Sequence, residues 1–155
     1  MENLSAVLFH EATPPYADVW VKGVNLRNTP ALLVDQAGGG LVTTVHDLRT
    51  FMRSLVKGQP VPMASFETDF TENAMHSGID VGLCAWRIRP RGVFFALAGL
   101  PTRVGHSGAT GVWAYCAAEW DAVFVGALSD SSWQEKHIEF LLRHVLPTLG
   151  RTKAP

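Results

Sequence analysis

Hydrophobic residues recur with helical spacing in two stretches of the chain. The first stretch follows the glycine run Gly38–Gly40, and its apolar members stand three or four positions apart, as one face of a helix requires. They are Val45, Leu48, Phe51, Met52 and Leu55. Thr44 is a natural N-cap, with Asp47 three residues later, and Gly58 supplies a stop. The spacing predicts a helix over about 45–57, within a glycine-rich turn and helix segment that covers 38–58.

The second stretch lies near the C-terminus and forms one apolar stripe. Its members are Ile138, Leu141, Leu142, Val145 and Leu146. Ser132 and Glu135 have the spacing of a capping box at its start. We therefore expect an amphipathic helix over about 133–147, within segment 132–148, packed against a sheet. His137 and His144 lie on this helix, and because two ligands without a third do not hold a metal, we expect both to be solvated surface residues.

The segment between the helices, 81–128, consists of strand-like runs separated by short turns. The runs cover 81–88, 92–98, 110–117 and 122–128. Short connections favour antiparallel neighbours, so an antiparallel sheet of about four strands is predicted.

The remaining segments carry weaker patterns. Residues 60–80 are expected mostly as loop, with one helical turn near 63–66, and residues 1–37 as an irregular lead segment with a short strand around Val19 to Val21. Strands grouped together, with a helix on the N-terminal side and another at the C-terminus, predict an α+β fold.

Composition limits the classes of function. The 155 residues suit one domain, and 13 Lys+Arg against 14 Asp+Glu give a net charge of −1 without a basic cluster, so neither nucleic acid nor a membrane surface is an expected partner. The apolar runs are shorter than the ~18 residues of a membrane span, and the N-terminus has no signal-peptide pattern, which predicts a cytoplasmic location. Charged residues make up only 17%, which favours an apolar face buried against a partner.

Two cysteines, Cys84 and Cys116, are too few for a metal cage and lack the spacing of a redox motif. We expect both to be inert core thiols. The sequence predicts no metal site and no cofactor.

Four segments, taken in order, carry a resemblance to a known family. Segment 37–51 contains Gly-Gly-Gly-Leu-Val-Thr-Thr-Val-His-Asp-Leu, 81–86 reads Val-Gly-Leu-Cys-Ala-Trp, 105–111 reads Gly-His-Ser-Gly-Ala-Thr-Gly, and 123–130 reads Val-Phe-Val-Gly-Ala-Leu-Ser-Asp before the final helix. In sequence and order they resemble the serine β-lactamase and penicillin-binding-protein superfamily. The branch they resemble holds class C β-lactamases, D-aminopeptidases and related esterases, and segment 105–111 is similar to the Gly-His-x-Gly form of its Lys-Thr-Gly box.

The resemblance implies a partial β-lactamase/transpeptidase-like fold and acyl transfer through a serine ester, on a β-lactam, a D-amino-acid peptide or an ester. The Lys-Thr-Gly strand borders the cleft of such enzymes. Mapped by motif, His106 would assist proton transfer and Ser107 would bind the substrate carboxylate. Ala109 would donate its backbone N–H to the oxyanion hole, and Gly108 would complete the substrate-binding segment.

The chain departs from this family by lacking the SxxK and Tyr-x-Asn boxes, which lie upstream of these segments in such enzymes. Ser54-Leu55-Val56-Lys57 matches SxxK literally. A catalytic SxxK opens a buried helix, whereas Ser54 falls in the last turn of the predicted helix, where Lys57 is expected to be a solvated charge. We therefore expect the chain alone to be an inactive, partial domain spanning 1–155, whose partner is a missing N-terminal half of the same fold.

Two alternatives stay open beside the partial hydrolase. The chain could be a non-catalytic binding or assembly module that forms a homo-oligomer, in which a second copy covers the apolar face. It could also be an unrelated small α+β domain that binds a ligand.

Overall fold

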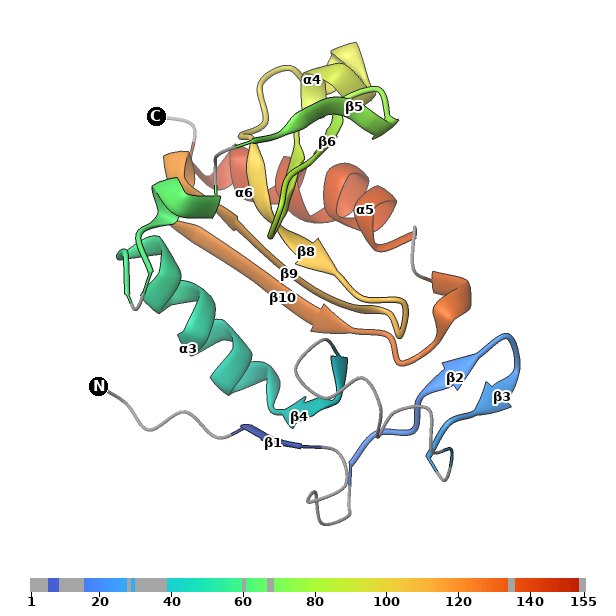
Figure 1. Ribbon diagram of the computed structural model, residues 1–155. Coiled ribbons are helices and arrows are strands. Elements are labelled where there is room, and N and C mark those ends of the chain that lie inside the picture. The colour runs from blue at the N-terminus through green and yellow to red at the C-terminus, as the bar shows by residue number, and fades with distance from the viewer. Residues whose placement is uncertain are drawn as a thin grey trace.

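The computed structural model describes residues 6–8, 16–27, 29, 39–59, 61–66, 69–133 and 136–153, which form an α+β fold built around one antiparallel sheet (Figure 1). The sheet has six strands in the order β10-β9-β8-β7-β6-β5, and every neighbouring pair is antiparallel. The strands are β5 (Thr71–His76), β6 (Ile79–Val81), β7 (Trp86–Ile88), β8 (Arg103–Ser107), β9 (Val112–Ala117) and β10 (Ala122–Ala127).

Two small sheets accompany it. The first pairs β1 (Ala6–Leu8) with β4 (Leu41–Thr43), and the second pairs β2 (Trp20–Val21) with β3 (Val24–Asn25). The Trp20 N–H donates to Ser129 O over 2.8 Å, which ties the second hairpin to the chain after β10. The short strand predicted around residues 19–21 is confirmed by β2.

Helices cover both faces of the sheet. On one face, Met52 and Leu55 of α3 (Val45–Val56) pack in a cluster with Val104 and Cys116. The opposite face carries a C-terminal helical segment composed of α5 (Lys136–Phe140), the π-helix η6 (Leu141–Val145) and α6 (Leu146–Lys153). Leu141, Leu142 and Leu146 of that segment form a second cluster with Ile88, Tyr115, Ala117 and Phe124. Successive residues of a strand point to opposite faces, so Tyr115 and Cys116 belong to different clusters.

The predicted helix over 45–57 is confirmed, together with its N-cap. Thr44 Oγ1 accepts the Asp47 N–H over 3.0 Å, which satisfies one of the donors left open at a helix start. Near the other end, Arg53 pairs with Asp121 over 3.0 Å, in the turn between β9 and β10. The cap and the ion pair hold α3 across the sheet.

Three differences from the four-strand prediction fall within residues 81–107. The predicted strand 81–88 is divided into β6 and β7 by a turn at residues 82–85. The predicted strand 92–98 is wrong, because that region of the chain forms α4 (Pro90–Val93) and the 3-10 turn η3 (Phe95–Leu97). Pro90 stands at the first helical position, where its fixed φ favours a helical turn over a strand. The run from 103 to 107, left between two predicted strands, is β8.

The prediction of loop over most of 60–80 is wrong for 71–76, which form β5. All six residues of β5 are exposed, so the strand has no alternation of apolar and polar positions from which it could be recognised. The helical turn predicted near 63–66 is confirmed by η2 (Met63–Phe66). The final helix is confirmed but runs on to Lys153, and two residues of its predicted start, 134 and 135, lie outside the described residues.

Among the described glycines, Gly105 has the closest main-chain neighbour. A Cβ placed there would lie 2.1 Å from Ala114 O and 2.7 Å from Tyr115 Cα, both of which are main-chain atoms of β9. We expect Gly105→Ala to lower the free energy of unfolding by about 2–3 kcal/mol, because β8 and β9 must move apart. Gly99→Ala is the matched control, since nothing lies within 4 Å of a Cβ there. Urea unfolding measures both, and equal midpoints for the two variants would contradict this packing.

Candidate functional site

The segment His106 to Ala109 lies where β8 extends past its neighbour β7. β8 pairs with β9 up to Ser107, opposite Trp113, but its last pair with β7 joins Gly105 to Trp86. Beyond Gly105, no strand among the described residues occupies the β7 side of β8. The edge of β8 that faces β7 is therefore unpaired, among the described residues, from His106 onward.

His106 and Ser107 have opposite environments. The His106 side chain is exposed, and its ring centroid lies 4.7 Å from that of Trp86, with the two planes tilted by 38°. Ser107 is only 3% exposed. Adjacent residues of a strand face opposite sides of the sheet, so the structure does not bring the imidazole and the hydroxyl to one surface.

A tight turn follows β8 and holds Ala109 at its tip. The Gly111 N–H donates to Gly108 O over 3.0 Å, and the Gly108 N–H donates to Val112 O over 2.8 Å. Gly111 has φ +79°, and a Cβ there would lie 2.9 Å from Asp130 O, so both its conformation and its surroundings favour glycine. Ala109 is exposed, and its N–H donates to no backbone carbonyl of the described residues. An N–H at the tip of such a turn points away from the strand ladder.

The literal SxxK lies apart from this segment. Ser54 is half-buried in the last turn of α3, and Lys57 is the exposed C-cap of the helix, both as predicted. A serine nucleophile needs a base within hydrogen-bond reach. Ser54 has no hydrogen bond to a base among the described residues, and its carbonyl accepts the Gln59 N–H over 2.9 Å.

Asp80 of β6 is a buried carboxylate with a complete set of donors. Oδ2 accepts Arg87 Nε over 2.7 Å, and Oδ1 accepts Arg89 Nη2 over 2.7 Å and the Asn73 N–H over 2.9 Å. Burial by itself would raise the pKa of Asp80, but the hydrogen bonds from Arg89, Asn73 and Arg87 outweigh it and hold that pKa below its usual value of 3.8. The carboxylate therefore fixes β5 and β7 to either side of β6.

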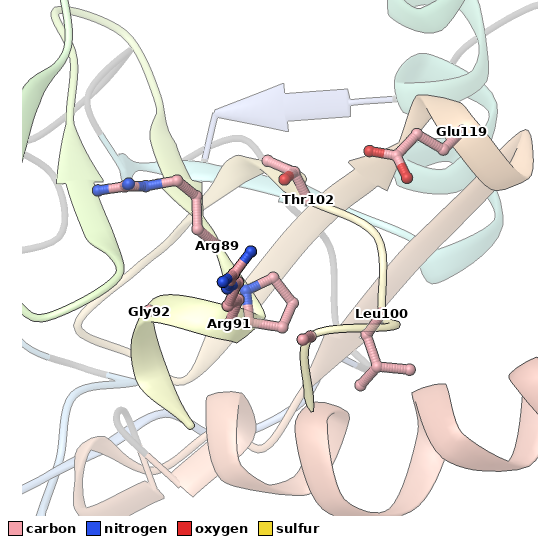
Figure 2. A pocket seen from close by; sticks show the side chains of 8 residues that line it. Arg89, Arg91, Gly92, Leu100, Thr102 and Glu119 are labelled. Atoms are coloured by element: carbon pink, nitrogen blue, oxygen red, sulfur yellow. The ribbon is translucent and has the colours of Figure 1, made fainter. Parts of the chain in front are cut away.

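A surface cavity of about 550 Å³ lies beside α4 (Figure 2). It is lined by Arg89, Pro90, Arg91, Gly92, Ala98, Leu100, Thr102 and Glu119, with the arginines on one side and Glu119 on the other. None of the residues from His106 to Ala109 lines it. The cavity therefore does not coincide with the site that the motif predicts.

His137 corrects the prediction of two solvated histidines. It is 1% exposed, its Nε2 lies 3.1 Å from Tyr115 Oη, and its ring is stacked at centroid distances of 6.0 Å from Trp113 and 5.8 Å from Tyr115. His137 stands four residues before the buried Leu141, so both lie on one face of the helix, and this spacing in the sequence indicates a buried histidine. His144 is exposed, as predicted. Among the described residues, no three His, Cys, Asp or Glu side chains are grouped so that they could hold a metal ion.

The two cysteines differ as well. Cys116 is buried, as expected, and its Sγ donates to Val104 O over 3.3 Å. The prediction of a core position is wrong for Cys84, which is exposed because the turn between β6 and β7 interrupts the expected strand.

Comparison of the sequence with known protein families and with curated proteins, and comparison of the fold with solved structures, finds no match. No helix in the described ranges is long and apolar enough to span a bilayer.

We expect Asp80→Asn to lower the free energy of unfolding by about 2–4 kcal/mol at pH 7, because it removes the charge that binds Arg87 and Arg89. Since the folded-state pKa of Asp80 is depressed, its contribution is complete above the unfolded pKa near 4 and is lost as the pH falls through the folded value. Urea unfolding between pH 7 and pH 2 should therefore have a shallower acid dependence in Asp80→Asn than in the wild type.

The matched control is Glu72→Gln, which removes a carboxylate that is largely exposed and lies 3.8 Å from Arg87. An exposed pair of this kind contributes at most about 1 kcal/mol. Parallel acid curves for the wild type and Asp80→Asn would show that Asp80 is not the linked group.

Proposed function

We propose that this chain is the C-terminal portion of a β-lactamase-like serine hydrolase, which transfers an acyl group through a serine ester and acts on a β-lactam, a D-amino-acid peptide or an ester. The observation that carries the proposal is the open end of β8. There the exposed His106 imidazole lies three residues in sequence from the Ala109 N–H, which has no backbone acceptor among the described residues. A proton-transfer group and an oxyanion donor at one strand end are two of the parts that acyl transfer needs.

The arrangement of elements supports the same proposal. The glycine-rich turn leads into α3 on one face of the sheet, β8 to β10 follow one another as antiparallel neighbours, and the C-terminal helices cover the other face. This arrangement places the four family-like segments at the start of α3, between β6 and β7, at the end of β8 and in β10. It leaves β10 as an outermost strand of the sheet.

The roles divide between His106 and Ala109. An imidazole can both accept and donate a proton, and histidine is the side chain most often used for proton transfer in catalysis. The Ala109 N–H would bind the oxygen of the tetrahedral intermediate. Because the Ser107 hydroxyl is buried on the other face, we assign the substrate contacts to His106 and the turn, with the nucleophilic serine supplied by an N-terminal half of the same fold.

A second candidate function, a non-catalytic assembly module, is favoured by exposed apolar side chains. Leu83 is 89% exposed and Phe95 is 77% exposed, and both lie in the connections that flank β7. A contiguous surface patch of such side chains is typical of contact with another polypeptide. This function predicts a stable oligomer of the chain by light scattering, with no acylation in any mixture.

The proposed hydrolase is tested by expressing the chain alone and together with the polypeptide encoded immediately upstream. We expect no labelling of the lone chain by a fluorescent penicillin and no turnover of a nitrophenyl ester, since the nucleophile is absent, and acylation of the mixture. In the active mixture, His106→Ala should lower the acylation rate by about 10²–10⁴-fold.

Ala109→Pro isolates the oxyanion donor. Ala109 is the second residue of the turn from Gly108 to Gly111, a position that favours proline, so the substitution removes one N–H and keeps the turn. We expect a loss of about 10²–10³-fold in acylation rate, while Ala109→Ser, which keeps the N–H, stays close to the wild type. Labelling of Ser54 in the lone chain, or equal rates for both Ala109 variants, would refute the proposal.

A further inference from the structure

Arg103 is a fully buried cation that has no counter-ion in the part of the chain that the structure describes. Its side chain is 0% exposed, and Nε, Nη1 and Nη2 have no hydrogen-bond partner among the described residues. Burial lowers the pKa of Arg103 to about 10, with a small opposing effect from Tyr115, so the guanidinium remains charged at neutral pH. A buried charge is costly unless it is paired and hydrogen-bonded.

Other donors lie on the same face of the sheet. Arg103 and Ser107 alternate with Gly105 along β8, and in the paired strand Tyr115 stands opposite Gly105 while Trp113 stands opposite Ser107. Residues with this register share one face, and Tyr115 belongs to the cluster under the C-terminal helices. Trp113 Nε1 and Ser107 Oγ are both buried, and neither makes a well-formed hydrogen bond.

Tyr115 does not neutralise Arg103. Burial raises the pKa of Tyr115 to about 12, although the nearby Ser107 hydroxyl and the charge of Arg103 lower it in part. The phenol is therefore neutral at physiological pH, and its oxygen already lies 3.1 Å from His137 Nε2. The face thus gathers N–H and O–H donors and one positive charge, with no carboxylate paired to that charge among the described residues.

We propose that Arg103 binds a small monovalent anion, a halide or a carboxylate of the size of formate, in the layer between β8 and the C-terminal helices. The guanidinium supplies the charge and a fork of N–H donors. Trp113 Nε1 and Ser107 Oγ are buried on the same face and have no hydrogen-bond partner of good geometry among the described residues. The ligand must be small because the donor atoms of Arg103, Ser107 and Trp113 are buried. This site is separate from the exposed side of His106 and does not depend on the proposed hydrolase activity.

The test is thermal unfolding of the full chain at constant ionic strength, with sodium gluconate replaced stepwise by sodium chloride or sodium formate. A ligand that binds only the folded state should raise Tm by about 3–5 °C for each tenfold increase above its dissociation constant. Gluconate is too large for an enclosed site, so the total salt is matched while only the small anion changes. A Tm that depends on ionic strength alone would overturn the proposal.

Arg103→Met is the decisive variant, because it keeps a long side chain and removes the charge. We expect it to lose the dependence on chloride and formate and, in gluconate, to be at least as stable as the wild type, since an unpaired buried charge has been removed. Arg143→Met is the matched control, because Arg143 is an exposed cation of the C-terminal helical segment, and it should keep the full dependence. An equal chloride effect in wild type and Arg103→Met would refute the assignment.

A direct measurement covers the case in which Arg103→Met does not fold. The ³⁵Cl NMR line of the wild-type protein should broaden in proportion to protein concentration, and formate should reverse the broadening by competition. Arg103→Lys keeps a charge but loses the fork, so its broadening should fall several-fold. Unchanged line widths in the wild type, or full broadening in Arg103→Lys, would overturn the site.

Discussion

The structure depends on a single strand, β8, that is packed on both of its faces. Val104 belongs to the cluster with α3, whereas Arg103 and Ser107 point to the side of the C-terminal helices. β9 approaches β8 so closely at Gly105 that no side chain fits at this position. The register of β8 against β9 is thereby fixed, and with it the side to which each later residue points.

The same alternation separates His106 from Ser107. In a strand with one solvated face, a one-residue shift could exchange them, but here that shift would place Val104 and Cys116 among the polar groups next to the C-terminal helices. The imidazole is therefore held outward beside Trp86, and the hydroxyl inward. Any chemistry at this strand end must use His106 and the following turn rather than the two adjacent side chains together.

The two fully buried charges of the sheet differ in their surroundings. Asp80 accepts hydrogen bonds from two arginines and one backbone N–H, and these lower its pKa in spite of burial. Arg103 has no such partner among the described residues, and burial alone dominates its pKa. Asp80 therefore stabilises the sheet as it stands, whereas Arg103 destabilises it unless an anion is bound. Because of this difference, we place the proposed ligand between the sheet and the C-terminal helices and not at Asp80.

Sequence reasoning recovered the elements whose pattern is local. The cap at Thr44 and the apolar stripe that contains Leu141 each specify a helix within a few residues, and both helices are present. β5 lacks such a pattern because all of its residues are exposed. The helical turn that begins at Pro90 lacks one because it depends on the fixed φ of a single proline. The pairing of β8 with its neighbours depends on contacts between residues far apart in the sequence. The pattern of apolar and polar positions within the strand does not reveal these contacts.

For the same reason, the sequence locates the candidate segment along the chain but does not give the direction of its side chains. A glycine-rich segment that contains a histidine is visible in the sequence, and it does form a strand end and a tight turn. The direction in which each side chain points is a property of the whole sheet, so the burial of Ser107 and the pairing of Asp80 with Arg87 could not be read from the motif. His106 is exposed and makes no hydrogen bond to a serine or threonine hydroxyl of the described residues. In the proposed hydrolase its partner in proton transfer would therefore come from a separate segment or from the substrate.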